Sequence, residues 1–126
     1  MNQKKYILIV DDEQDVLQIM LKTIISRCRM KYQPLVCVDG FEALEFMIDK
    51  KIDLVVLDLN MDNFNGLQVC QRMMQDPELK SIPVIISSGH LDPSMVEQLQ
   101  SLGVKYFLKK PYPMNDLVEK IEEVIG

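Results

Sequence analysis

Three aspartates, a serine and a lysine stand at the ends of apolar runs in this sequence, and together they could support phosphoryl-group chemistry. They are Asp11, Asp12, Asp58, Ser88 and Lys110. A carboxylate such as Asp58 can attack phosphorus and form an acyl phosphate. A hydroxyl and an ammonium can bind the oxygens of the group in transfer. This chemistry requires the five side chains to lie close together.

Each of these residues has a commoner explanation when it is taken alone. An aspartate or a serine after a buried strand is usually a turn former or a helix cap. The adjacent acidic residues Asp11 and Asp12 would then be a solvated loop, and Lys110, which precedes a proline, would be a solvated side chain. The hypothesis of a site therefore depends on whether the fold brings these residues together.

The hydrophobic pattern alternates five times between short apolar runs and segments with apolar residues at helical spacing. We expect strands at residues 6–10, 35–38, 54–58, 83–88 and 105–109, each followed by a helix. The second helix is marked by Leu44, Met47 and Ile48. This alternation predicts an α/β fold, a doubly wound five-stranded parallel sheet with helices on both faces, because each right-handed crossover returns the next strand parallel to the last. We expect residues 1–126 to form one domain.

Parallel strands all end at the same edge of a sheet, so this fold would bring the five residues to one crevice. Two carboxylates about 4 Å apart repel by about 4 kcal/mol at an effective dielectric constant near 20. Asp11, Asp12 and Asp58 would therefore need a cation. Oxygen ligands without histidine or thiolate favour Mg²⁺ or Mn²⁺.

Composition excludes several classes of function. The formal net charge is −5 and the pI is about 4.8, which argues against nucleic acid as a direct partner. No apolar run approaches the roughly 20 residues that span a bilayer, so we expect a cytoplasmic protein without membrane contact. The cysteines Cys28, Cys37 and Cys70 lie within apolar segments without metal-ligand spacing. We interpret them as small reduced core residues.

The chain resembles the receiver domain of two-component response regulators over residues 5–125. Five motifs carry the resemblance: IVDDE at 9–13, DGFEAL at 39–44, LDLNM at 57–61 leading to Gly66, PVIISSG at 83–89 and FLKKPY at 107–112. The resemblance implies a flavodoxin-like (βα)5 fold with strand order 2-1-3-4-5. It implies a single phosphoacceptor domain.

The resemblance also implies roles for the metal-site residues. Asp58 is the expected phosphorylation site. Asp12, Asp58 and the main-chain carbonyl of Asn60 are expected to hold Mg²⁺ or Mn²⁺, and Asp11 is expected to hold it mostly through water.

The other motif residues are expected to read and transmit the phosphorylated state. Ser88 and Lys110 match the hydroxyl and the lysine that contact the phosphoryl group, and Lys110-Pro111 is expected to be a cis peptide bond. Phe107 matches the switch aromatic, which turns inward when the Ser88-type hydroxyl moves toward the phosphoryl group. Tyr106 is expected on the opposite side of the strand.

Two positions depart from the family pattern or could modulate the site. Asp62 stands where the family usually has proline, so the loop after the phosphoacceptor loses rigidity and gains a negative charge. We expect weaker metal binding as a result. His90, the only histidine, lies two residues after Ser88 at a position that influences hydrolysis in this family, although a surface loop residue is the simpler interpretation.

The leading interpretation is a signalling domain that takes a phosphoryl group from the phosphohistidine of a sensor histidine kinase or a phosphotransfer protein. It would switch the surface formed by its fourth helix, fifth strand and last helix, which could also form a homodimer. It would not be an enzyme beyond its own phosphorylation and dephosphorylation. The cognate kinase and the downstream effector are not specified by the sequence.

Two other functions fit the fold. An aspartate-based phosphatase or phosphotransferase also uses a strand-end aspartate with magnesium, but it favours a second aspartate two positions later, where this chain has Asn60. A flavodoxin-like binding module would need a glycine- and hydroxyl-rich phosphate loop, and none follows a predicted strand. An inactive receiver is disfavoured because all five site residues are present.

Overall fold

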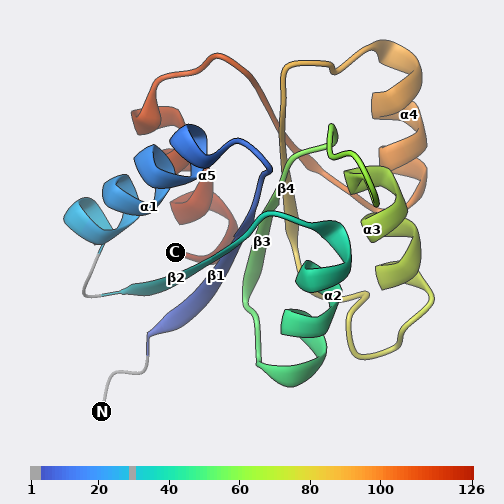
Figure 1. Ribbon diagram of the computed structural model, residues 1–126, viewed down its shortest axis with the longest axis horizontal. Coiled ribbons are helices and arrows are strands. Elements are labelled where there is room, and N and C mark those ends of the chain that lie inside the picture. The colour runs from blue at the N-terminus through green and yellow to red at the C-terminus, as the bar shows by residue number, and fades with distance from the viewer. Residues whose placement is uncertain (1–3, 29–30) are drawn as a thin grey trace.

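The computed structural model describes residues 4–28 and 31–126. The one-domain prediction also covers residues 1–3 and 29–30, which lie outside the described residues. The described chain forms five strands that alternate with five helices (Figure 1). In chain order they are β1 Lys5–Val10, α1 Gln14–Cys28, β2 Tyr32–Cys37, α2 Gly40–Asp49, β3 Leu54–Leu57, α3 Gly66–Met74, β4 Val84–Ser88, α4 Pro93–Ser101, β5 Tyr106–Lys109 and α5 Met114–Ile125.

The strands form one parallel sheet in the order β2-β1-β3-β4-β5. This confirms the predicted fold class and strand order. Helices α1 and α5 cover one face, and α2, α3 and α4 cover the other (Figure 1). The central strand β3 is apolar at every position because successive side chains point to opposite faces of the sheet and both faces are covered. Thus Val55 and Leu57 pack toward α2–α4, whereas Leu54 and Val56 pack toward α1 and α5.

Two details of the sequence-based prediction were wrong. β2 begins at Tyr32, not at residue 35, and continues through Pro34; a proline is tolerated there because β2 is an edge strand with one neighbour. Ile48 of α2 was expected in the apolar stripe but is 68% exposed. The stripe of α2 follows Ala43, Leu44 and Met47 instead.

Other local predictions are confirmed. Cys28, Cys37 and Cys70 are free and buried. Tyr106 and Phe107 pack toward opposite faces of the sheet. Within the described residues, none of the helices has the length and apolar character needed to cross a membrane.

Candidate functional site

The carboxyl ends of β1 and β3 place two buried carboxylates side by side. Val10 pairs with Leu57 in the parallel register, so the residues that follow them, Asp11 and Asp58, are neighbours across the sheet. The Asp58 amide donates to the Val10 carbonyl at 2.9 Å, and this bond extends the ladder to the edge. Asp11 is 1% exposed and Asp58 is 4% exposed. Sheet pairing therefore fixes both side chains.

A third carboxylate completes an acidic cluster. One oxygen from each of Asp11, Asp12 and Asp58 can be chosen so that all three lie within 4.8 Å of one another, and Asp12 is exposed. Three oxygen donors at this separation suit a hard divalent cation, which also keeps water ligands. The cluster could hold a metal ion.

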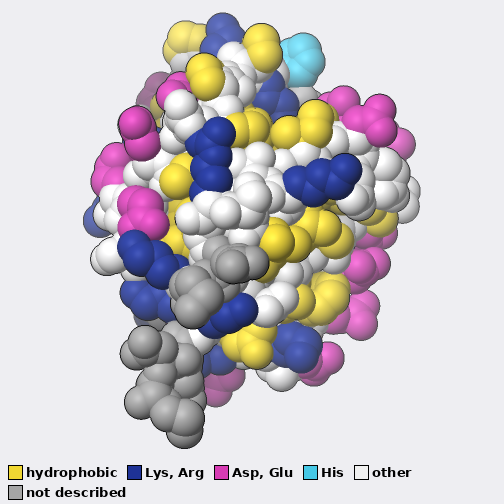
Figure 2. Space-filling view, turned by 90° about the vertical axis from the view of Figure 1, so that its left-hand side faces the viewer, with side chains coloured by type: hydrophobic (Ala, Val, Ile, Leu, Met, Phe, Trp, Pro, Cys, Tyr) yellow, Lys and Arg dark blue, Asp and Glu magenta, His cyan; other side chains and the backbone are white. Residues whose placement is uncertain are grey.

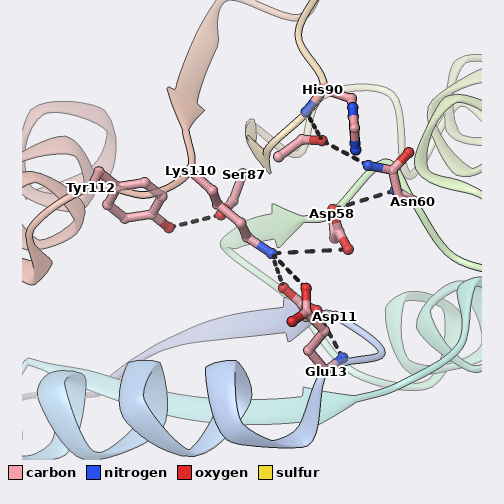
Figure 3. Close-up of polar contacts among 9 residues, drawn as sticks. Asp11, Glu13, Asp58, Asn60, Ser87, His90, Lys110 and Tyr112 are labelled. Atoms are coloured by element: carbon pink, nitrogen blue, oxygen red, sulfur yellow. Dashed lines mark hydrogen bonds and ion pairs between the residues drawn. The ribbon is translucent and has the colours of Figure 1, made fainter.

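Lys110 brings the only positive charge that the structure places in ion pairs with these carboxylates among the described residues. Its Nζ lies 2.6 Å from Asp11 Oδ2, 4.0 Å from Asp58 Oδ2 and 3.9 Å from Glu13 Oε1 (Figure 3). The Lys110 amide donates to the Ser88 carbonyl at 2.9 Å, and the Lys110-Pro111 peptide bond is cis, as predicted. The lysine thus contacts both buried aspartates.

The Asp58 carboxyl loses its proton less readily than an ordinary aspartate does. Burial raises its pKa from 3.8 to about 6, and the negative charge of Asp11 adds to the increase. Lys110 and the hydrogen bond from the Asn60 amide act in the opposite direction. Desolvation and like charge disfavour the carboxylate more than its single cation stabilises it.

Ser88 ends β4 beside this cluster, fully buried. Its Oγ accepts a hydrogen bond from the His90 amide at 3.2 Å and one from Asn60 Nδ2 at 3.4 Å. His90 and Asn60 are exposed, and their side chains lie close to each other near Asp58 (Figure 3). The structure therefore brings Ser88, Asn60 and His90 to the same edge as Asp58.

A pocket of about 600 Å³ opens above Asp58 and Lys110. Its wall on one side is apolar and comes from α1 and the segment that begins α5, with Val16, Met20 and Met114 among the lining residues. An incoming group can thus approach Asp58 past an apolar surface.

Two predicted residues lie apart from this pocket wall. Phe107 is on β5, half-buried, and packs against the core on the side of α2–α4. Asp62 is exposed and lines a separate groove of about 220 Å³ together with Asp12. Asp62 is therefore near one member of the acidic cluster.

Three residues at the site were missed by the sequence analysis. Glu13 approaches Lys110, and the buried Ser87 forms a 2.7 Å hydrogen bond with Tyr112, which lines the pocket. Glu13 could have been found from its place after Asp11 and Asp12. A second serine in an otherwise apolar strand was the available signal for Ser87.

The fold is that of a flavodoxin-like α/β domain, and its carboxyl edge carries an acidic cluster with a lysine and a serine beside it. Residues 7–122 match the family model described as the response regulator receiver domain. The chain belongs to this family, and it is a receiver domain of two-component signalling.

Individual relatives agree with this assignment. The chain is 31% identical over 94% of its length to the CAI-1 autoinducer sensor kinase/phosphatase CqsS of Vibrio cholerae, of which it spans only 17%. It is 27% identical over 99% of its length to sporulation initiation phosphotransferase F of Bacillus subtilis, of which it spans 95%. The solved structure of chemotaxis protein CheY4 of Vibrio cholerae shares the fold with a TM-score of 0.89 at 21% identity, covering 98% of this chain and 100% of that one.

Proposed function

We propose that Asp58 accepts a phosphoryl group from a phosphohistidine and that the domain passes on the signal through a changed surface. The observation that carries this proposal is the buried Asp58 carboxylate at the base of an open pocket, with Lys110 Nζ 4.0 Å away and two further carboxylates beside it. Membership of the receiver family supports it.

The transfer requires one bond to form and one to break. An oxygen of the Asp58 carboxylate attacks phosphorus, the P–N bond to the donor imidazole breaks, and its electron pair stays on that nitrogen. The protein contributes position and charge: Lys110 would place its ammonium on one phosphoryl oxygen, and Ser88 would donate its hydroxyl hydrogen to another. The raised pKa of Asp58, about 6, still leaves it mostly ionised at pH 7.5.

We propose that the acidic cluster holds Mg²⁺, or Mn²⁺, through Asp11, Asp12, Asp58 and the main-chain carbonyl of Asn60. When bound, such an ion neutralises oxygens of the transferring group. The side chains of the cluster suit such an ion, because the three carboxylates repel one another and offer only hard oxygen ligands. Asp62, on the groove next to Asp12, would lower metal affinity through its effect on the loop after Asp58.

The output would be a change in the surface formed by α4, β5 and α5. Movement of Ser88 toward the phosphoryl group would free space for Phe107 to turn inward. His90 would modulate hydrolysis of the acyl phosphate, since its amide is bonded to Ser88 Oγ. The same surface is the candidate homodimer contact.

The proposed donors are a sensor histidine kinase or a histidine phosphotransfer protein in the cytoplasm. On the face shown in Figure 2, lysine and arginine side chains stand among hydrophobic ones, and acidic side chains gather mainly toward the margins.

Exposed Ile19 of α1 lines the pocket beside Asp58. An apolar helix surface of a donor could pack there and deliver its histidine. We propose no direct contact with nucleic acid or membrane.

The enzymatic alternative is weaker. A phosphomonoesterase of the aspartate-based class would place an acid/base carboxyl two residues after the nucleophile, and Asn60 cannot exchange a proton in that role. We propose one receiver domain over residues 1–126 that acts only on its own acyl phosphate.

The test is labelling by a small phosphodonor, phosphoramidate, with Mg²⁺, followed by intact mass and hydroxylamine treatment. Wild type should gain one phosphoryl group, which hydroxylamine removes because it attacks acyl phosphates. Asp58→Asn should gain none. Asp76→Asn, the same change at a half-buried aspartate in the turn after α3, should label like wild type. Equal labelling of Asp58→Asn would overturn the assignment.

A further inference from the structure

A partly buried hydrogen bond links the end of β4 to the segment that follows Lys110. Ser87 Oγ and Tyr112 Oη lie 2.7 Å apart, a normal distance for two hydroxyls. Ser87 is 1% exposed, and Tyr112 is half-buried in the pocket wall. Neither hydroxyl belongs to the acidic cluster or to the set that would contact the phosphoryl group.

The bond starts at Ser87, one pair before the end of the β4–β5 ladder, and reaches the chain beyond β5. Ser88 pairs with Lys109, and the Lys110 amide donates to the Ser88 carbonyl at 2.9 Å. After Lys110 the chain leaves the sheet and turns into α5 at Met114. The Ser87–Tyr112 bond therefore joins the sheet to the segment immediately after the lysine (Figure 3).

Tyr112 and Met114 of this segment pack against the core on the side of α1 and α5, but the prolines beside Tyr112 limit the hydrogen bonds that the segment can make. Pro111 and Pro113 have no amide hydrogen to donate, both are exposed, and Pro113 at the start of α5 makes no side-chain cap hydrogen bond. The Tyr112 side chain turns back toward the sheet and contributes to the same pocket as Asp58 and Lys110. Its hydroxyl is thus a polar anchor of the segment within the site.

The hydroxyl also remains a neutral partner over the range in which the site would work. Burial, with the charges of Asp11 and Asp58, raises the pKa of Tyr112 to about 12, although its hydrogen bond with Ser87 lowers it. The bond is therefore present without a change of charge from acidic to mildly alkaline pH.

We propose that the Ser87–Tyr112 hydrogen bond is a positioning device: it fixes the Lys110 segment against the end of β4, so that Lys110 and Ser88 hold one geometry relative to Asp58. This inference rests on the proposed phosphoacceptor function. Lys110 Nζ is 2.6 Å from Asp11 but 4.0 Å from Asp58, and a small displacement of its segment changes the second distance. Loss of the hydroxyl pair would slow transfer, because catalytic groups lose efficiency steeply with misplacement.

The test measures the initial rate of labelling by phosphoramidate for Tyr112→Phe, Ser87→Ala and the double variant, each at saturating Mg²⁺. We expect each single variant to be slower by about fivefold to tenfold. We expect the double variant to be no slower than the singles, because one bond is removed in all three. Affinity for Mg²⁺ should stay within about twofold of wild type, since neither residue is a proposed ligand.

Tyr106→Phe is the matched control, because Tyr106 of β5 pairs with Ile85 of β4, two register positions before Ser87. It should label at the wild-type rate. Wild-type rates for Tyr112→Phe and Ser87→Ala, multiplied effects in the double variant, or a loss of Mg²⁺ affinity equal to the loss of rate would each overturn the positioning role. An unlabelled wild-type protein, or labelling that persists in Asp58→Asn, would instead overturn the proposed function.

Discussion

Asp58 is held in the protein at a cost in stability, and this cost gives a pH-dependent prediction. Its pKa rises from 3.8 to about 6 on folding, so the native state binds this proton more tightly than the unfolded state does. The stabilisation from protonation is complete below pH 3.8 and is lost as the pH rises through 6. In the absence of a metal, ionised Asp58 therefore destabilises the fold at pH 7.5.

Replacing Asp58 by Asn should remove this penalty. We expect metal-free Asp58→Asn to be more stable than wild type at pH 7.5 by on the order of 2 kcal/mol. The difference should shrink toward pH 4, where wild type is largely protonated at this position. Urea unfolding at the two pH values with a chelator present measures it. A difference that does not depend on pH would contradict the role given to the charge, which Asp11, Asp12 and Lys110 surround.

Residue types at strand ends were enough to predict most of the site. Asp11, Asp58 and Ser88 could be placed because each ends an apolar run, and parallel strands bring such ends together. Which atoms Lys110 contacts could not be predicted, because that depends on the course of the chain after β5. The Ser87–Tyr112 bond was missed for the same reason: it joins side chains from two segments whose separation only the packed structure fixes.

Helix α3 begins in direct contact with the backbone of Asp58 and Leu59, the two residues that follow β3. Asn65 caps α3: its side chain accepts from the Gln68 amide, and the Gln68 side chain accepts from the Asn65 amide. Gly66, the first residue of α3, donates to the Leu59 carbonyl at 3.2 Å. A Cβ at Gly66 would fall against the Asp58 carbonyl oxygen and 2.9 Å from the Leu59 Cα. The absence of a side chain here lets α3 approach the backbone that follows β3.

Gly66→Ala should therefore destabilise the protein and disturb the site together. Backbone atoms must move to admit the methyl group, so we expect a loss of roughly 2–3 kcal/mol of unfolding free energy. We also expect slower labelling at Asp58. Gly89→Ala is the control for stability, because a Cβ there meets nothing within 4 Å. Denaturant unfolding measures the stability of both variants. Equal stability of Gly66→Ala and Gly89→Ala would contradict the prediction, because it would show that α3 can shift to admit the methyl group at little cost.

Elements were predictable where hydrophobic spacing is strong and less so at the margins of the sheet. The central strands were placed within a residue or two because both of their faces are covered. At edge strand β2, Pro34 obscured the start of the strand, since a lost ladder bond costs little on the open side. Ile48 fits the helical spacing of α2 but is exposed, because spacing alone does not say how wide the buried stripe is.

The arrangement of the whole molecule concentrates negative charge at one edge of an already acidic protein. Two helical layers bury both faces of the sheet. The carboxyl edge carries the cluster of Asp11, Asp12 and Asp58, and Asp58 and Lys110 line the open pocket there. The net charge of −5 adds to the repulsion. A divalent cation that binds only the native state would relieve it and so stabilise the fold.

Magnesium should therefore raise the melting temperature of the protein. At a Mg²⁺ concentration about 100 times the Kd, linkage gives about 2.7 kcal/mol, which corresponds to about 10 °C for a domain of this size. Differential scanning calorimetry with and without MgCl₂ measures the shift, and NaCl at equal ionic strength is the control for screening. Asp12→Asn, which alters an exposed carboxylate without opening the core, should lose most of the shift. If Mg²⁺ raised the melting temperature of Asp12→Asn as much as that of wild type, the cation would bind elsewhere. Asp12 is the one exposed carboxylate of the cluster and so the one most able to move toward the ion.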